Sequence, residues 1–180
     1  RRMFNMRERL TREYGRLRIE YAATADVEEY MRDMNRLHAI RWGEPVFEGS
    51  KLEFNTQIAR ALAKKRKLRM SRIIVRGNVV SVLFNMRCGR QEINLQAGFD
   101  DRFDTNIPLG YVHLGLAVEH CFESDVDTLD LLAGRGKNTD YKSQLSTQRR
   151  ELTVVQVVPK PAFALGYQIR DRFRESRNRP

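Results

Sequence analysis

Three successive segments with a period of two constrain the fold of this chain most strongly. Apolar and polar side chains alternate in these segments, and turns at Gly77 and Gly89 separate them: 68–76, 79–87 and 91–97. Alternation is typical of strands with one buried face, and short turns join antiparallel neighbours. The sequence therefore predicts an antiparallel meander at the centre of the chain.

Helical periodicity flanks this meander on both sides. Apolar side chains recur every three to four positions over residues 2–14 and again between Thr24 and Trp42. A third helix is expected to begin with Ser50 as its cap, because serine side chains accept hydrogen bonds from the first free N–H groups of a helix. Residues 109–123 are apolar around most of the helix circumference, which indicates a helix that packs on a sheet.

Shorter segments complete the expected order of elements. Extended character recurs at 17–21, 128–133 and 152–158, and a helix is expected over 141–149. This order predicts an α+β fold, a mixed α/β layer in which helices cover a mostly antiparallel central sheet. We expect three parts of the chain: a basic helix over 1–14, the α+β domain over 15–160 and a basic tail over 161–180.

The composition is that of a folded domain. Of the 180 residues, 41% are hydrophobic and 31% are charged. No run approaches the roughly 20 apolar residues of a membrane helix, and no apolar segment follows the N-terminus as in a signal peptide. We therefore expect a soluble, cytoplasmic protein. The first residue is Arg rather than Met, which leads us to expect a processed chain or part of a longer protein.

Cysteine and histidine give little support to a metal site. Cys88 and Cys121 are too few for a disulfide framework and lack CxxC spacing. His113 and His120 share a helix face with Cys121 adjacent, but tetrahedral zinc needs a fourth ligand. We therefore expect no metal, and we expect a reducing compartment.

Positive charge is concentrated in the first half of the chain. Lys and Arg number 33 against 23 Asp and Glu, and residues 1–90 hold 21 of the basic and 10 of the acidic residues. No acid lies between Glu53 and Glu92, where the basic residues form a block: Arg60, Lys64, Lys65, Arg66, Lys67, Arg69, Arg72 and Arg76. Such a surface suits nucleic acid, anionic lipid or a phosphorylated ligand, although charge runs are also common on solvated helix faces.

Four local patterns occur in the same order as in a known family. They are Leu37-His38-x-x-Arg41-Trp42-Gly43 with Phe47; Gly98-Phe99-Asp100; Pro108-Leu109-Gly110; and Leu129-Asp130-Leu131-Leu132-Ala133-Gly134 followed by Tyr141-Lys142. Over about residues 15–155, the chain resembles the acyl-CoA N-acyltransferase (GNAT) superfamily. More narrowly, it resembles the acetyltransferase domain of a bacterial family named for cellulose biosynthesis, whose fold the Fem-type aminoacyl transferases share.

The resemblance implies acetyl-CoA, or another acyl-CoA, as co-substrate. In this superfamily the sheet splays beside its fourth strand, and backbone groups there pair with the pantetheine arm of CoA. The matching residues are Leu95, Gln96 and Ala97. The pyrophosphate lies at the start of the next helix, because free N–H groups and the helix dipole attract anions. Here that start consists of Pro108, Leu109, Gly110, Tyr111 and Val112.

The chain departs from the superfamily at this phosphate loop. The usual pattern is Gln/Arg-x-x-Gly-x-Gly/Ala, whereas this chain has Asn106-Ile107-Pro108-Leu109-Gly110-Tyr111. We expect Gly110 to let a phosphate approach the backbone, since glycine has no side chain. Pro-x-Gly is also common at helix starts for purely structural reasons.

Acyl transfer needs a base for the acceptor and an acid for the departing thiolate. By the resemblance, Tyr141 supplies that proton, with Lys142 beside it. We expect Asp100 to be the base, with His38 next. The residues expected to hold the acceptor are Arg41, Trp42, Asp130 and Lys142. A carboxylate in a buried strand needs a partner, for which Arg41 and Lys142 are the candidates at Asp130. The alternative for His38, Trp42 and Tyr141 is a purely structural role.

The leading hypothesis is an acyltransferase that moves an acetyl or acyl group from acyl-CoA to an amine or hydroxyl. The resemblance points to cell-surface polysaccharide or other envelope acceptors. A second hypothesis is an aminoacyl-tRNA-dependent transferase whose basic block holds the RNA backbone. A third is a non-catalytic module of the same fold that binds a polyanion.

Overall fold

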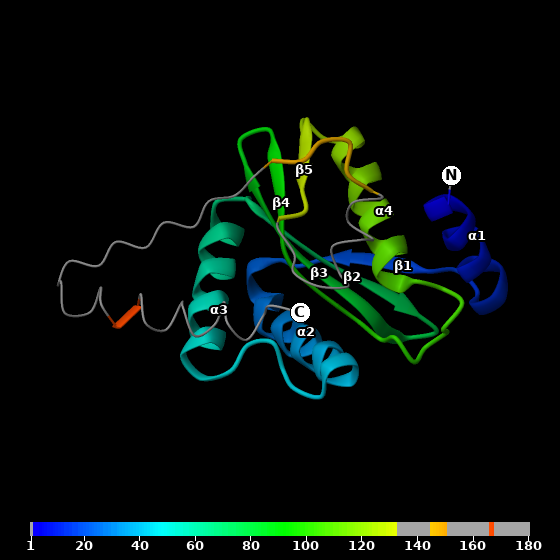
Figure 1. Cartoon of the computed structure of the whole chain (residues 1–180), viewed down its shortest axis with the longest axis horizontal. Helices are drawn as coiled ribbons and strands as arrows, with labels where there is room; N and C mark the ends of the chain where they lie inside the picture. The colour runs from blue at the N-terminus through cyan, green and yellow to red at the C-terminus, as the bar shows by residue number, and fades with distance from the viewer. Residues whose placement is uncertain (1, 133–144, 151–165, 168–180) are drawn as a thin grey trace. The chain divides into compact units, whose positions relative to one another are not determined.

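In the part of the chain that the structure describes, five strands form one sheet. The structure is a computed structural model, and it describes residues 2–132, 145–150 and 166–167. The strands are β1 (Arg18–Tyr21), β2 (Leu68–Val75), β3 (Asn78–Cys88), β4 (Gln91–Phe99) and β5 (Thr128–Asp130), and they lie side by side in this order (Figure 1). Strands β1 to β4 pair antiparallel and β5 pairs parallel with β4. The mostly antiparallel sheet expected from the sequence is confirmed.

The helices lie where the periodicity predicts them, except at one start. They are α1 (Arg2–Tyr14), α2 (Val27–Trp42), α3 (Gly49–Lys64) and α4 (Leu109–Glu123), and a short 3-10 helix (Thr24–Asp26) precedes α2. The predicted Ser50 cap is wrong, because α3 begins at Gly49 and Glu48 is its cap. The backbone carbonyl of Glu48 accepts the Lys51 N–H at 3.0 Å, so no serine side chain is needed there.

The chain divides into two units, Arg1–Lys142 and Ser143–Pro180, and all these elements belong to the first. The strand expected at 152–158 lies outside the described residues. The helix expected over 141–149 is wrong for residues 146–149, which are not helical. Serine and threonine in this segment offer the backbone alternative hydrogen bonds, which weakens helix formation.

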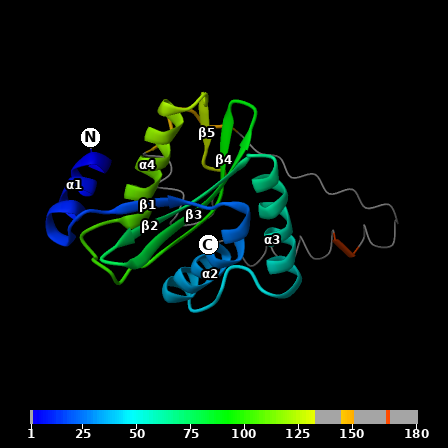
Figure 2. The same ribbon diagram turned by 180° about the vertical axis from the view of Figure 1, so that it is seen from behind.

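Two hydrophobic layers hold the first unit together. Figures 1 and 2 show α2 on one face of the sheet and α4 on the other. Under α2, Tyr30, Met34 and Leu37 pack with apolar residues of β2 and β3. Under α4, Leu109 and Val112 pack with strand residues of the opposite face. Within the described residues, no helix has both the length and the apolar character needed to cross a bilayer.

Helix α1 packs on the outer side of α4. Arg7 donates a hydrogen bond from Nη1 to Glu119 at 2.8 Å. A side chain at Gly115 would lie 3.0 Å from Cβ of Met3, so this glycine permits the close contact of the two helices. The N-terminal basic helix is thus part of the first unit.

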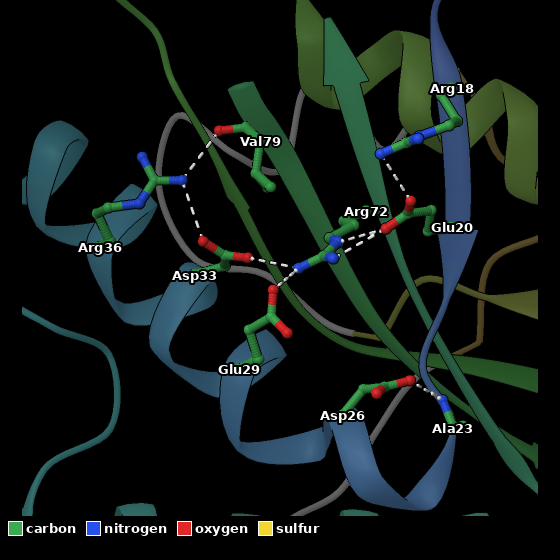
Figure 3. Close-up of polar contacts among 9 residues, drawn as sticks. All are labelled: Arg18, Glu20, Ala23, Asp26, Glu29, Asp33, Arg36, Arg72 and Val79. Carbon is green, nitrogen blue, oxygen red and sulfur yellow. Dashed lines mark hydrogen bonds and ion pairs between the residues drawn. The ribbon is translucent and has the colours of Figure 1, made fainter. Parts of the chain in front are cut away.

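A cluster of charges ties α2 to the sheet (Figure 3). Arg72 of β2 donates to Glu20 of β1 at 2.9 Å, to Glu29 at 2.5 Å and to Asp33 at 3.2 Å. Its side chain is only 14% exposed, and its guanidinium lies over the Tyr30 ring. Burial lowers the pKa of Arg72, but the hydrogen bonds to Glu29 and Glu20 outweigh this effect, so the pKa is raised. One side chain therefore connects β1, β2 and α2.

We predict that Arg72→Met lowers the free energy of unfolding by about 2 to 3 kcal/mol, because three carboxylates lose their shared, largely buried partner. Arg90→Met is the matched control, since Arg90 also pairs with two carboxylates, Asp125 and Asp127, but its side chain is 58% exposed. Exposed ion pairs contribute less than about 1 kcal/mol. Urea denaturation of both variants measures the difference. Equal losses would contradict the role of Arg72.

Candidate functional site

Strands β4 and β5 pair only over a short stretch. The last pair in the described residues joins Ile93 to Asp130, although β4 continues to Phe99. Asp130 turns the chain at this point: its Oδ1 accepts the N–H of Leu132 at 2.8 Å, and Leu132 adopts a left-handed φ of +52°. Its Oδ2 accepts a hydrogen bond from Gln91 at 3.2 Å. Within the described residues the sheet therefore opens after Asp130, and the predicted strand over 128–133 is shorter than expected.

A bulge lies on β4 beside this opening. Phe84 pairs with Gln96, but the next residue, Asn85, pairs with Asn94, so Leu95 is an extra residue on β4. A bulge bends its strand and increases the local twist. The second half of β4 therefore changes direction at Leu95. Within the described residues, no strand pairs with β4 from Asn94 to Phe99 on the β5 side, where the resemblance leads us to expect an opening.

The bulge is followed by an unusual local hydrogen bond. The N–H of Ala97 donates to Oε1 of the Gln96 side chain at 3.0 Å. This bond satisfies a backbone donor within β4 itself, next to the opening. The Leu95 side chain packs against the core under α2, so what Leu95 and Ala97 offer at the opening is mainly backbone.

The start of α4 presents two further backbone donors. The carbonyl of Pro108 accepts the N–H groups of Tyr111 at 2.9 Å and Val112 at 3.0 Å. Among the residues that the structure describes, the N–H groups of Leu109 and Gly110 have no acceptor. The first turn of α4 contains no acidic residue. The positive end of the helix dipole is therefore not neutralised by a carboxylate of its own first turn.

Phe99 explains the glycine at this helix start. A Cβ on Gly110 would lie 2.6 Å from the Phe99 ring. Any larger residue at this position would therefore force the ring or the helix start to move. The sequence led us to expect that Gly110 lets a phosphate approach, whereas the contact that requires a glycine in the structure is with Phe99. The side chains of Leu109 and Val112 are buried in the core, so only their backbones can meet a ligand.

Three candidate residues lie at the C-terminal end of α2. The Arg41 guanidinium lies 4.7 Å from the Trp42 ring and 4.4 Å from the Phe99 ring. Nδ1 of His38 lies 2.8 Å from the carbonyl oxygen of Glu44. Because a carbonyl only accepts, Nδ1 carries the proton and Nε2 of neutral His38 keeps its lone pair. Trp42 is 54% exposed. The structure therefore brings an imidazole, a guanidinium and an exposed aromatic ring together at the end of α2.

The loop after β4 joins this group. Asp100 Oδ1 accepts the N–H of Arg102 at 2.9 Å, and Arg102 donates to the Ile40 carbonyl at 3.2 Å. The loop is therefore attached to the end of α2. Asp130 lies on β5, and within the described residues its side chain accepts hydrogen bonds from Gln91 and the Leu132 amide. Lys142, expected as a partner alongside Arg41, lies outside the described residues, as does Tyr141.

Sequence reasoning missed a buried polar chain on the α4 side of the sheet. Asn85 donates to Glu92 at 2.6 Å, and Asn94 donates to Asn85 at 2.7 Å. These three side chains are at most 5% exposed. The available signal was polar residues at strand positions that alternation assigns to the core. Nearby, burial and the charge of Glu92 raise the pKa of Cys121 to about 12, which keeps this thiol protonated.

Two serine hydroxyls hold the buried His113 ring inside the fold. Its Nδ1 lies 2.8 Å from Oγ of Ser81 and its Nε2 lies 3.0 Å from Oγ of Ser71. Burial lowers the pKa of His113 to about 3, so the ring is neutral. Over residues 2–132 and the two shorter described segments, no three His, Cys, Asp or Glu side chains gather as a metal site would require.

Comparison with known proteins identifies the fold. The family model for the acetyltransferase (GNAT) domain matches residues 1–143. No curated protein matches the sequence. A possible acetyltransferase from Clostridium difficile 630 is similar with a TM-score of 0.58 at 14% identity, over 80% of this chain and 99% of that one. The predicted link to the cellulose-biosynthesis and Fem-type families goes beyond these matches and stays a prediction.

Two further solved structures have the same architecture. One is an aminoglycoside acetyltransferase from an uncultured soil metagenomic sample in complex with sisomicin, with a TM-score of 0.57, 13% identity and coverage of 83% of this chain and 99% of that one. The other is a ribosomal-protein-alanine N-acetyltransferase from Brucella melitensis biovar Abortus 2308, with a TM-score of 0.53, 14% identity and coverage of 79% and 99%. At such identities the likeness shows the fold.

We predict that His113 makes the folded chain less stable in acid. An unfolded histidine titrates near about pH 6.5, whereas the buried ring stays neutral down to about pH 3, so only the unfolded chain gains the proton between these values. Stability is complete above about pH 6.5 and falls below it, by about 2 kcal/mol at about pH 5. Denaturation at several pH values should show a shallower slope for His113→Gln. His120→Gln, the control, should keep the wild-type slope, and a shared slope for all three would contradict the assignment.

Proposed function

We propose that this chain, which belongs to the acetyltransferase (GNAT) domain family, transfers an acetyl group from acetyl-CoA to an amine or hydroxyl of a small polar acceptor. Enzymes of this family use acetyl-CoA as donor, and residues 1–143 match the family. The observation that carries the proposal is the opening of the sheet after Ile93 and Asp130, beside free backbone donors at the start of α4.

The donor fits the backbone on both sides of this opening. We assign the pantetheine arm to the edge of β4 at Leu95, Gln96 and Ala97, where a ligand carbonyl would replace the Gln96 side chain at the Ala97 N–H. We assign the pyrophosphate to the free N–H groups of Leu109 and Gly110. Oriented N–H groups at a helix start hold anions without a lysine or arginine.

The acceptor site is assigned to the end of α2. His38 offers an unprotonated Nε2, and Asp100 lies just past β4, so either can accept a proton from the attacking group. The exposed face of Trp42 suits the apolar face of a sugar ring, and Arg41 adds positive charge. The similarity to an aminoglycoside acetyltransferase bound to sisomicin supports an amine on a sugar-like molecule. An envelope polysaccharide remains the alternative acceptor.

The basic block gives less support to an RNA-dependent transferase. Arg60 pairs with Glu28, and Arg72 belongs to the cluster that ties α2 to the sheet. Arg76 donates to the carbonyls of Glu13 and Tyr14, each at 3.2 Å. Several arginines of the block thus have partners within the fold. Part of the positive charge of the block therefore stabilises the fold rather than serving a ligand.

Thermal unfolding with added ligands tests the donor. We expect acetyl-CoA and CoA to raise the melting temperature by about 5 to 10 °C at about a hundredfold excess over Kd, since only the folded chain binds them. Uncharged tRNA and heparin are the polyanion controls and should produce a smaller shift that salt abolishes. No shift with acetyl-CoA at millimolar concentration would refute the proposed donor.

We predict that Tyr141→Phe lowers turnover by about a hundredfold while Kd for acetyl-CoA stays within about twofold, because a general acid acts on the leaving thiolate and not on binding. Thiol release with an aminoglycoside acceptor measures turnover. Tyr21→Phe is the control, since Tyr21 lies on β1, at the edge of the sheet away from β4, and should leave turnover unchanged. A Tyr141→Phe enzyme of normal rate removes Tyr141 from the mechanism.

A further inference from the structure

The bulge on β4 is attached to a buried carboxylate through two asparagines. Glu92 accepts a hydrogen bond from Asn85 at 2.6 Å, and Asn85 accepts one from Asn94 at 2.7 Å. The side-chain amide of Asn94 also donates to the backbone carbonyl of Gln96 at 3.4 Å. This series of hydrogen bonds therefore starts at the first half of β4, crosses to β3 and returns to β4 beyond the bulge.

The chemistry of these groups sets the direction of every bond. A buried carboxylate only accepts, so Asn85 must turn its NH₂ group toward Glu92 and its oxygen toward Asn94. Asn94 must then present its own NH₂ group to Asn85. This leaves the second hydrogen of the Asn94 amide for the Gln96 carbonyl. The acceptor oxygen of Glu92 thus determines the orientation of both asparagine amides.

The last acceptor in this series of hydrogen bonds, the Gln96 carbonyl, is part of the peptide that the donor would contact. The carbonyl of Gln96 and the N–H of Ala97 belong to one planar unit, in which the two groups point in opposite directions. A bond that holds the Gln96 carbonyl on the Asn94 side therefore also determines where the Ala97 N–H points. That N–H lies beside the opening of the sheet, where the Gln96 side-chain oxygen now accepts it.

We propose that Glu92, Asn85 and Asn94 are positioning residues that orient the Gln96–Ala97 peptide so that its N–H meets a carbonyl of the acetyl donor. This inference rests on the proposed function. None of the three side chains touches the donor, because each is buried on the α4 side of the sheet. They act through the Gln96–Ala97 peptide. Without the donor, the Gln96 side-chain oxygen accepts the Ala97 N–H, and the donor carbonyl takes its place on binding.

The test compares Asn94→Ala with Ser71→Ala. Each variant removes one partner from a buried polar network on the same sheet face, but Ser71 contacts His113 and has no bond to β4. Calorimetric titration with acetyl-CoA measures Kd, and the amide signals of Gln96 and Ala97 in two-dimensional NMR report the peptide directly. Melting temperatures of both variants provide the common measure of lost stability.

We expect Asn94→Ala to raise Kd for acetyl-CoA about tenfold, the effect of one lost hydrogen bond in the bound state, and to shift the Ala97 amide signal. Ser71→Ala should lower the melting temperature comparably, with Kd within about twofold of wild type and an unmoved Ala97 signal. An unchanged Kd for Asn94→Ala, or equal weakening in both variants, would overturn the proposal.

A second pair of variants covers the case in which Asn94→Ala fails to fold. Glu92→Gln keeps an acceptor oxygen for Asn85 and should bind acetyl-CoA within about twofold of wild type. Glu92→Leu removes that acceptor and should weaken binding about tenfold. Equal binding by the two would overturn the proposal. If wild type does not bind acetyl-CoA, the proposed function fails, and the Ala97 signal alone decides whether the polar chain orients the peptide.

Discussion

Backbone N–H and C=O groups inside a sheet need partners, and the interruption of this pairing between β4 and β5 is the constraint on which the rest of the site depends. In the part of the chain that the structure describes, pairing ends at Ile93 and Asp130, where the Asp130 side chain accepts the amide of Leu132. The extra residue Leu95 redirects β4 at nearly the same level. An opening between two strands of a sheet exposes backbone donors that a carbonyl-rich ligand can satisfy.

The two faces of the sheet support this opening in different ways. On one face, Arg72 connects β1, β2 and α2 through three carboxylates, which places the end of α2, with His38 and Trp42, beside the end of β4. On the other face, buried polar side chains replace part of the apolar core. Such groups are costly unless they are hydrogen-bonded, and within the described residues hydrogen bonds join both asparagines to Glu92.

Strand and helix boundaries, including the start of α4, were predictable, because periodicity and glycines indicate them well. The assignment of Leu95, Gln96 and Ala97 to the donor came from the family resemblance and stays a prediction. Side-chain roles were harder to predict. Gly110 accommodates Phe99, Asp130 ends a strand, and a buried chain through Asn85 and Asn94 escaped notice, because each depends on residues that come together only after the sheet has formed.

Local sequence alone determined the order and type of the elements from residue 2 to residue 130, since hydrophobic period and turn residues act over a few positions. It also indicated the family to which the chain belongs. Only the tertiary structure decided where the sheet opens, which arginines serve the fold, and which polar groups are buried together. Those outcomes depend on contacts between strands and helices that are distant in sequence, and no pattern within one segment encodes the partner that another segment will supply.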